Sequence, residues 1–494
     1  MTDYLALDIG AESGRAIVVK LDGDQLTINE VHRFGNGPVR LPDGLHWDVL
    51  RIWSEIKAGI TAAIRCGAQP AGIGLDTWGV DFALLDKNGA LLGNPFHYRD
   101  ARTDGILDEA FRRVPRVEIF AQTGIQFMQL NSLYQLLVMS LSKSPLLDVA
   151  ETFVTIPDLF NYWLSGKISN EFTISTTTQC FNPLTCDWAR GMLDTLGISS
   201  RLFHAVIQPG TVLGTMLPEV VEETGAGSMS VVAPACHDTG SAVAAIPALN
   251  QDFAWISSGT WSIIGAEVRQ PILGEKALSN NITNEGGVFG TWRSCKNIMG
   301  LWLVQECRRT WRNHGEDLSY DEITRLAAGA RPFLAVIDPD ANLFFHPGDM
   351  PDKIRKYCAE TGQAVPQTKG ELVRVALESL ALKYRDTLER LEELNGKRLE
   401  PIHIIGGGTK NRLLNQFTAD CTGRIVVTGP IEAAAIGNAL MQAIALGQLG
   451  SLAEARAIVR KSFPVETYQP VSRAGWVDAY AKYQNLISSG SDQG

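Results

Sequence analysis

The chain has 494 residues, of which 45% are hydrophobic and 20% are charged. Single hydrophobic cores stop growing at roughly 250 to 300 residues, so this length predicts two large domains. The net charge of −10 argues against a nucleic-acid surface, because such a surface needs a basic stripe. The sequence has no run of 18 apolar residues and begins Met1-Thr2-Asp3-Tyr4, without a basic leader, so we expect a cytoplasmic protein with no membrane span.

The eight cysteines are scattered along the chain. None forms a CxxC pair, and none lies in a His/Cys cluster at zinc-ligand spacing. We therefore expect mostly reduced thiols, as is usual in cytosolic enzymes, and assign no disulfide pairing.

The N-terminal region reads as a series of strands. Tyr4–Gly10 is an apolar run that ends in an acid and a glycine, and Ala11–Arg15 follows as a tight turn. Ala16–Leu21 and Leu26–Phe34 predict two further strands. A loop rich in Gly and Pro then leads to a helix over residues 48–65, where apolar residues recur at helical spacing.

The same pattern begins again near the middle of the chain. Phe253–Ala266 reads as a strand, a turn of small residues and a second strand. We interpret this as a repeat of the fold with a boundary near Pro247, which predicts domains at 1–246 and 247–494.

A nucleotide site is suggested further along the second half. Glu371–Leu394 carries one apolar stripe at helical spacing and is followed by Asn395-Gly396 as a stop signal. A short strand, His403–Ile405, then leads through Gly406–Gly408 to a helix from about Asn411. A glycine run before a helix N-terminus suits a nucleotide, and the absence of GxxxxGK[ST] from the sequence argues against a P-loop.

The first segment with chemistry is the turn after the first strand. Backbone N–H groups of Ala11–Arg15 could cradle phosphate, while Asp8 organises Mg²⁺ through water. An ordinary hairpin turn is the alternative. Glu12 raises a difficulty, because two like charges about 4 Å apart repel by about 4 kcal/mol at an effective dielectric constant of 20. Glu12 must therefore turn outward, pair with Arg15 or another cation, or help to hold Mg²⁺.

Two further segments are typical of polyol recognition. Gly74–Phe82 (GLDTWGVDF) and Tyr98–Arg102 (YRDAR) combine aromatic and polar residues. A sugar needs fixed donors and acceptors together with an aromatic face. Structural alternatives remain open: turn caps at Asp76 and Asp81, and a surface ion pair between Arg99 and Asp100.

The segment His237-Asp238-Thr239 lies where an apolar strand turns into a helix of small residues. Phosphoryl transfer to a hydroxyl needs mainly positioning and a carboxylate that accepts the proton, a role that Asp238 fits. The alternative for Asp238 is an N-cap of the helix around Ser241. His237 is the competing base, although a histidine beside an acid is more often its orienting partner. Ser257–Ser262, with hydroxyls in place of the acid, suits a loop for the β- and γ-phosphates.

Taken in this order, the segments resemble the FGGY family of carbohydrate kinases over nearly the whole chain. The strings that carry the resemblance are GLDTWGVDF, YRDAR, TGIQF (123–127), His237-Asp238-Thr239, NITNEGG (281–287) and KNIMGLW (296–302). The resemblance implies an α/β fold of two actin-like (ribonuclease H-like) ATPase domains with a catalytic cleft between them. It gives residues 1–246 the sugar and part of the phosphate site, and residues 247–494 the ATP site and a C-terminal helical tail.

The resemblance also implies roles for single residues. Asp238 is the proton acceptor. ATP would meet Ala11, Glu12, Ser13, Gly14, Arg15, Thr260, Gln305 and Gly407, and the sugar would meet Gly79, His237, Asp238, Thr239 and Asn297. Family members commonly carry a small hydroxyl residue where this chain has Glu12. ATP and Mg²⁺ are the implied cofactors, and a monomer or homodimer is expected.

Within the family, the strings are most similar to those of members that act in rhamnose catabolism. They imply transfer of the ATP γ-phosphate to the 1-hydroxyl of L-rhamnulose, giving L-rhamnulose 1-phosphate and ADP. Two alternatives remain: a kinase for another ketose or deoxy-sugar such as L-fuculose, and a nucleotide-gated actin-like binding module without catalysis.

Overall fold

The structure is a computed structural model that describes residues 1–490. These residues fold into two compact units. The first unit comprises residues 1–249, 267–294 and 432–463, and the second comprises residues 250–266, 295–431 and 464–490. Residues 267–294 and 432–463 lie in the second half of the sequence but belong to the first unit.

The first unit contains a six-stranded sheet in the order β13-β14-β6-β1-β2-β3. These strands are β1 (Thr2–Ile9), β2 (Ser13–Asp22), β3 (Gln25–Gly35), β6 (Pro70–Thr77), β13 (Thr211–Thr215) and β14 (Ser230–Ala233). Smaller strands are β4 (Pro38–Leu41), β5 (Gly44–Trp47), β7 (Phe82–Leu85), β8 (Thr152–Thr155), β9 (Asn170–Glu171), β10 (Phe181–Asn182), β11 (Asp187–Trp188), β12 (Val206–Ile207) and β17 (Thr283–Gly286).

The helices of the first unit are α1 (Val49–Arg65), α2 (Ile106–Arg113), α3 (Arg116–Thr123), α4 (Ser132–Leu141), α5 (Pro145–Val149), α6 (Ile156–Ser165), α7 (Phe172–Ser175), α8 (Arg190–Thr195), α9 (Pro218–Thr224), α10 (Asp238–Ala244), α11 (Glu275–Ser279), α18 (Ala433–Ala445) and α19 (Leu452–Ser462). The sheet packs against helices that include α1, α6 and α18, and other helices of the first unit lie away from it. Short 3₁₀ turns are η1 (Ala101–Thr103), η2 (Thr176–Thr178) and η3 (Ser200–Leu202).

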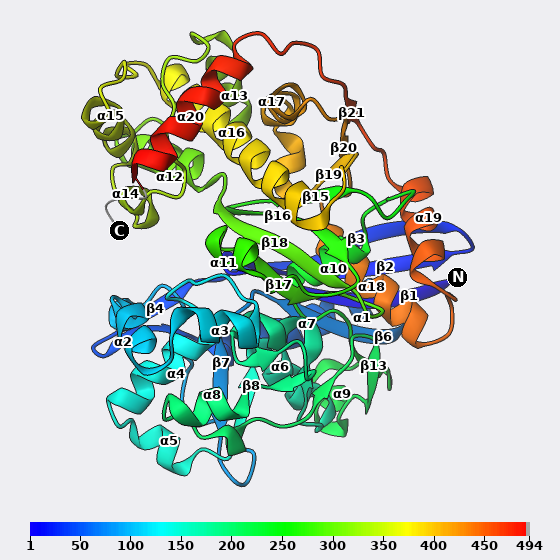
Figure 1. The fold of residues 1–494 in the computed structure, drawn as a ribbon. Helices are drawn as coiled ribbons and strands as arrows, with labels where there is room; N and C mark the ends of the chain where they lie inside the picture. Colours follow the sequence, from blue (N-terminus) through cyan, green and yellow to red (C-terminus); the bar gives the residue numbers. More distant parts are fainter. Residues whose placement is uncertain (491–494) are drawn as a thin grey trace. The chain divides into compact units, whose positions relative to one another are not determined.

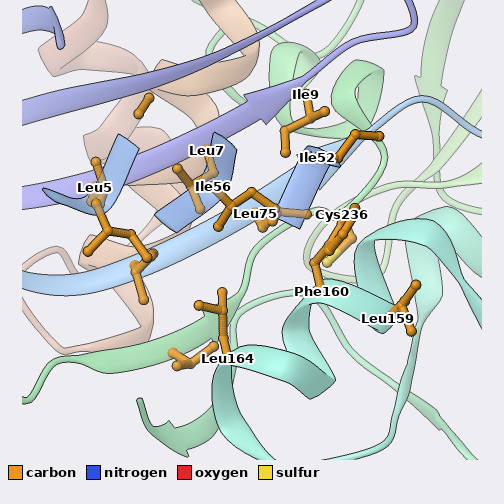
Figure 2. Packing of buried hydrophobic residues seen from close by; sticks show 14 of the residues in the cluster. Leu5, Leu7, Ile9, Ile52, Ile56, Leu75, Leu159, Phe160, Leu164 and Cys236 are labelled. Carbon is orange, nitrogen blue, oxygen red and sulfur yellow. The ribbon is translucent and has the colours of Figure 1, made fainter. Parts of the chain in front are cut away.

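The two faces of β1 differ in chemistry. Successive side chains of a strand point to opposite faces, so Leu5, Leu7 and Ile9 share one face. They join a buried apolar cluster that includes Ile52 and Ile56 of α1 (Figure 2). Asp8, between Leu7 and Ile9, therefore points to the opposite face, the one that α18 covers.

The second unit repeats the strand pattern of the first, as the sequence predicts. Its strands are β15 (Ala254–Ser258), β16 (Trp261–Val268), β18 (Trp292–Met299), β19 (Ile402–Ile405), β20 (Val426–Thr428) and β21 (Thr467–Tyr468). Strand β15 pairs antiparallel with β16 and parallel with β19. Strand β1 of the first unit likewise pairs antiparallel with β2 and parallel with β6.

The helices of the second unit are α12 (Trp302–Asn313), α13 (Tyr320–Gly329), α14 (Asn342–Phe345), α15 (Met350–Glu360), α16 (Lys369–Asn395), α17 (Arg412–Thr422) and α20 (Trp476–Gly490), with η4 (Gly407–Lys410). The long yellow helix α16 lies beside the red helix α20 (Figure 1). As predicted, α16 ends at Gly396, whose φ of 66° suits glycine. No helix within residues 1–490 is long and apolar enough to cross a membrane, and within the same residues no two cysteines are joined in a disulfide bond.

Candidate functional site

Three neighbouring chain segments of the first unit bring acids together. Asp8 of β1 and Asp76 of β6 are partners in the parallel ladder. The Thr77 N–H donates to the Cys236 carbonyl at 2.9 Å, which places the end of β6 beside the segment that carries Asp238. Asp238 raises the pKa of both Asp8 and Asp76 by charge repulsion. The sequence pattern predicts Asp8 and Asp238 as site residues, and the structure brings them into one acidic cluster with Asp76.

The three acids differ in how far they are exposed to solvent. Asp8 and Asp76 are buried, whereas the Asp238 side chain is 31% exposed. Burial is the largest cause that raises the pKa of Asp8, to about 6, and Arg15 partly opposes it. Burial also raises the pKa of Asp76 well above its usual range, with Asp8 as the second cause. Asp238 is thus the acid of this cluster that solvent and a small molecule can reach.

Asp238 has one occupied and one available carboxylate oxygen. Its Oδ1 accepts the Thr239 N–H at 2.5 Å and the Thr239 hydroxyl at 3.1 Å. Its Oδ2 accepts no hydrogen bond from the described residues of the first unit. The predicted N-cap role is wrong, since His237 is the N-cap of α10 and Asp238 is its first helical residue.

The small residues of α10 and α18 hold this segment in place. A Cβ on Gly437 would lie 1.7 Å from the carbonyl oxygen of Ser241, so only glycine permits this approach of the two helices. On the same helix, Asn438 donates to Asp76 at 2.6 Å, and Gln442 donates to the Leu5 carbonyl at 3.0 Å. The backbone of α10, and with it Asp238, is therefore fixed by close packing.

The predicted phosphate turn is tight. The Gly10 N–H donates to the Ser13 carbonyl at 3.0 Å. Asn36 donates from its side chain to the Gly10 carbonyl at 2.9 Å and from its backbone to the Glu12 carbonyl at 2.9 Å. Two carbonyl oxygens that would repel phosphate are thus bound to donors. A Cβ on Gly14 would lie 2.2 Å from the Phe34 ring, so glycine is required beside this turn.

Arg15 does not form an ion pair with Glu12. Its Nε lies 3.5 Å from Asp8 Oδ2, and its Nη1 donates to Glu432, the N-cap residue of α18. Glu12 is exposed. Of the alternatives for Glu12, the outward position fits this geometry, and pairing with Arg15 does not.

The segment around Gly79 is built on buried side chains, while Gly79 and Val80 themselves are half-buried. Asp81 Oδ2 accepts the indole N–H groups of Trp47 at 2.6 Å and Trp78 at 2.9 Å, and Asp81 Oδ1 accepts Gln135 at 2.8 Å. Burial raises the pKa of Asp81 to about 6 although these three hydrogen bonds lower it. Asp81 is therefore structural, by holding indoles rather than by capping a turn.

Backbone strain marks the same segment. Val80 has a φ of 67°, which is rare for a β-branched residue. Thr177 holds this conformation by accepting the Val80 N–H at 3.1 Å, and a Cβ on Gly79 would lie 3.2 Å from the Thr177 hydroxyl. Strained residues of this kind cluster at ligand sites.

The YRDAR segment extends the aromatic face. The Trp47 and His97 rings lie 4.2 Å apart, and His97 stacks on Tyr98 at 4.5 Å. Asp100 is not in a surface ion pair, because it is buried and accepts the backbone N–H groups of Leu45 at 2.7 Å and Arg102 at 3.0 Å. Trp47 and His97 are buried, so the half-buried Tyr98 is the ring of this stack that a polyol could contact.

The remaining predicted residues belong to the second unit. Thr260 lies between β15 and β16, and its carbonyl accepts the N–H groups of Gly300 at 3.1 Å and Trp302 at 3.2 Å. This contact joins the Ser257–Ser262 loop to the KNIMGLW string. Gln305 lies on α12, directly after that string.

Gly407 lies at the start of η4, where it is exposed. A Cβ on Gly407 would have no heavy atom within 4 Å, whereas a Cβ on Gly408 would lie 2.0 Å from the Ser258 hydroxyl. The glycine run therefore packs on the Ser257–Ser262 loop on one side and is open at Gly407. These are the features expected of a turn that a ribose or base approaches closely.

Asn297 lies on β18 next to a lysine in an unusual environment. Burial, followed by the charge of Lys383, lowers the pKa of Lys296 to about 8. Lys383 itself lies 3.0 Å from Asp338 and 2.8 Å from Asp340, and Asp340 accepts the Met299 N–H at 2.8 Å. A partly buried network of charges thus anchors the end of the strand that carries Asn297.

Sequence reasoning missed several residues of the first unit that support the acids. They are Glu285, Arg293, Glu432 and Asn438, together with Thr173, whose hydroxyl accepts the His237 N–H at 3.1 Å. A signal was present for two of them. Glu285 lies in the string NITNEGG, and Asn438 and Gln442 are polar residues four apart in an otherwise apolar helix.

Comparisons with known proteins agree with this architecture. The family model for the N-terminal domain of the FGGY family of carbohydrate kinases matches residues 3–245, and the model for its C-terminal domain matches residues 254–446. The fold is similar to that of a xylulose kinase from Lactobacillus acidophilus, with a TM-score of 0.81 and 18% identity over 100% of this chain and 97% of that one. It is also similar to the glycerol kinase of Plasmodium falciparum, with a TM-score of 0.79 and 15% identity over 99% and 98%.

Curated relatives align over nearly the full length. A rhamnulokinase of Bacteroides thetaiotaomicron is 42% identical over 98% of this chain and 99% of its own. A rhamnulokinase of Bacillus subtilis is 38% identical over 94% and 95%. The predicted two-domain α/β fold is confirmed, and the chain belongs to the FGGY family of carbohydrate kinases.

Proposed function

We propose that this carbohydrate kinase transfers the γ-phosphoryl group of ATP to the 1-hydroxyl of L-rhamnulose, giving L-rhamnulose 1-phosphate and ADP. One observation carries the choice of sugar. Relatives named rhamnulokinase are 38–42% identical to this chain over 94–98% of its length.

Asp238 is the proton acceptor in this proposal. Its Oδ2 is available, while Thr239 holds Oδ1 and thereby fixes the orientation of the carboxylate. As the sugar oxygen forms its bond to phosphorus, the hydroxyl proton passes to Oδ2. Gly79, His237, Thr239 and Asn297 are the proposed sugar contacts.

Asp8 is the proposed partner of Mg²⁺, through water. The residues fit a cation, because burial and the charge of Asp238 raise the pKa of both Asp8 and Asp76, and a positive charge would relieve that repulsion. Mg²⁺ is usually held by one or two carboxylates, water and phosphate rather than by a full protein cage. When bound, it neutralises charge on the phosphates.

The proposed nucleotide contacts divide between the two units. Ala11, Glu12, Ser13, Gly14 and Arg15 form the turn whose carbonyl oxygens at Gly10 and Glu12 are already bound by Asn36. Thr260, Gln305 and Gly407 of the second unit complete the set. Gly407 supports this role because it is exposed and a side chain there would meet no other group.

A coupled assay of ADP release over L-rhamnulose, L-fuculose, D-xylulose and glycerol tests the proposal. We expect the highest kcat/KM with L-rhamnulose. A strong preference for another acceptor would overturn the choice of sugar. ATP binding without ADP release for every acceptor would instead indicate a nucleotide-gated binding module.

A further inference from the structure

We propose that Arg293 is a positioning residue that fixes the tautomer of His237. In that tautomer the ring proton is on Nε2, and the N–H points toward Asp238. Arg293 itself makes no substrate contact in this arrangement. The kinetic consequence rests on the proposed function, in which Asp238 is the base. The tautomer itself is a property of the protein alone.

Arg293 lies within a fully buried cluster of the first unit. Its side chain is 0% exposed, and its Nε donates to the Gly286 carbonyl at 2.9 Å, which fixes the plane of the guanidinium. From that plane, Nη2 lies 3.0 Å from His237 Nδ1 and 3.2 Å from Glu285 Oε2. The His237 side chain is only 8% exposed, so water does not compete freely for its ring.

The hydrogen-bonding capacity of arginine decides the tautomer. A guanidinium has N–H donors and no acceptor, so its contact with Nδ1 requires Nδ1 to accept. A neutral imidazole carries one N–H, which must then be on Nε2. A proton on Nδ1 would instead direct two N–H groups at one another across 3.0 Å.

Electrostatics alone do not reverse this assignment. Glu285 Oε2 lies 3.3 Å from His237 Nδ1 and would favour a proton there. The guanidinium lies 3.0 Å from the same atom and disfavours it. Because the two opposite charges are at nearly equal distances, their Coulomb effects on Nδ1 nearly cancel. The geometry of the Arg293 hydrogen bond therefore settles where the proton lies.

The tautomer of His237 determines what the ring presents to the Asp238 carboxylate. His237 Nε2 lies 3.5 Å from Asp238 Oδ1, the oxygen to which Thr239 also donates. With the proton on Nε2, His237 presents an N–H rather than a lone pair to Oδ1 at 3.5 Å, and Oδ2 is left to receive the sugar proton. The other tautomer would direct a lone pair at the carboxylate. A protonated Nε2 also cannot accept the sugar proton, so Arg293 separates the roles of His237 and Asp238.

The direct test is the ¹⁵N spectrum of ¹⁵N-histidine-labelled full-length protein at pH 7, with the His237 signals assigned by their loss in His237→Gln. We expect the wild-type ring to be neutral, with the proton on Nε2. A proton on Nδ1, or a charged imidazolium, would overturn the proposal. The experiment needs no Arg293 variant, so it decides even if such variants do not fold.

Kinetics of Arg293→Met provide the second test. Methionine keeps much of the volume and removes the donor, so we expect kcat to fall about 10- to 100-fold, the usual effect of losing an outer partner of a site residue. The KM for ATP should stay within about threefold of wild type, and Arg293→Lys should restore part of kcat. Arg113→Met removes an arginine from a helical ion pair with Glu109 on α2 and should change neither constant. An unchanged kcat in folded Arg293→Met would contradict the inference.

The two proposals can fail separately. If L-rhamnulose is not phosphorylated but the His237 spectrum shows the proton on Nε2, the sugar assignment is wrong and the tautomer stands. If L-rhamnulose is phosphorylated while the proton is on Nδ1, the role of Arg293 is wrong and the kinase assignment stands.

Discussion

Asp238 and Asp81 are aspartates in two strings of the same unit, and their surroundings give them different tasks. Asp81 is 1% exposed, and Trp47, Trp78 and Gln135 donate to both of its oxygens. The Asp238 side chain is 31% exposed, and only Oδ1 is held. An acid whose oxygens are all bound orders the fold, whereas an acid with one available oxygen can accept a proton.

Replacing Asp81 should have the largest effect on stability. Asp81→Ala leaves two indole N–H groups without an acceptor in a buried site, each at a cost of about 1–3 kcal/mol. We therefore expect the free energy of unfolding at pH 7 to fall by about 2–5 kcal/mol, measured by denaturant titration. Asp22→Ala, at the exposed end of β2, is the control and should change it by less than about 0.5 kcal/mol. An Asp81→Ala protein as stable as wild type would break the comparison.

The difference in stability between wild type and Asp81→Ala should depend on pH. Burial raises the pKa of Asp81 to about 6 in the folded state, above its unfolded value of 3.8. The folded protein then holds the proton more tightly, so the stabilising contribution is complete below pH 4 and is lost as pH rises through 6. The stability of wild type relative to Asp81→Ala should fall by up to about 3 kcal/mol between pH 4 and 6. A difference that rises over this range would contradict the assignment.

Replacing Gly437 tests the packing of α10 on α18, which holds Asp238 in place, rather than Asp238 itself. In Gly437→Ala, the new methyl group meets the Ser241 carbonyl at 1.7 Å, so α10 must move away from α18. Overpacking of this kind costs about 1–3 kcal/mol, and kcat should fall with it because Asp238 begins α10. Gly191→Ala in α8 is the matched control, because its methyl group would have no heavy atom within 4 Å. Equal stability of the two variants would show that the helix contact is not restrictive.

Much of this arrangement can be predicted from local sequence, and the exceptions share one cause. The helix at 48–65 and the strands around it follow from the spacing of apolar residues, and the structure adds Asp48 as the N-cap of that helix. The contact of Asn438 with Asp76 joins residues 362 positions apart. No local pattern specifies such a partner. For the same reason, the sequence suggested a sugar contact at His237 but could not reveal Arg293.

Replacing Glu12 should have the smallest effect. Glu12 is exposed, and one like charge about 4 Å from phosphate repels it by about 1 kcal/mol in water. Glu12→Gln should therefore lower the KM for ATP by no more than about fivefold and leave kcat unchanged. A large loss of activity would mean that the Glu12 side chain, and not only the backbone of the turn, holds the metal or the nucleotide.

The proposed chemistry depends most on Asp238, and one variant tests it directly. Asp238→Asn preserves the shape of the side chain and removes the proton acceptor. We predict that phosphorylation of L-rhamnulose falls at least about 100-fold, while the dissociation constant for ATP and the unfolding midpoint stay close to wild type. A folded Asp238→Asn protein that retains wild-type kcat would contradict this role for Asp238.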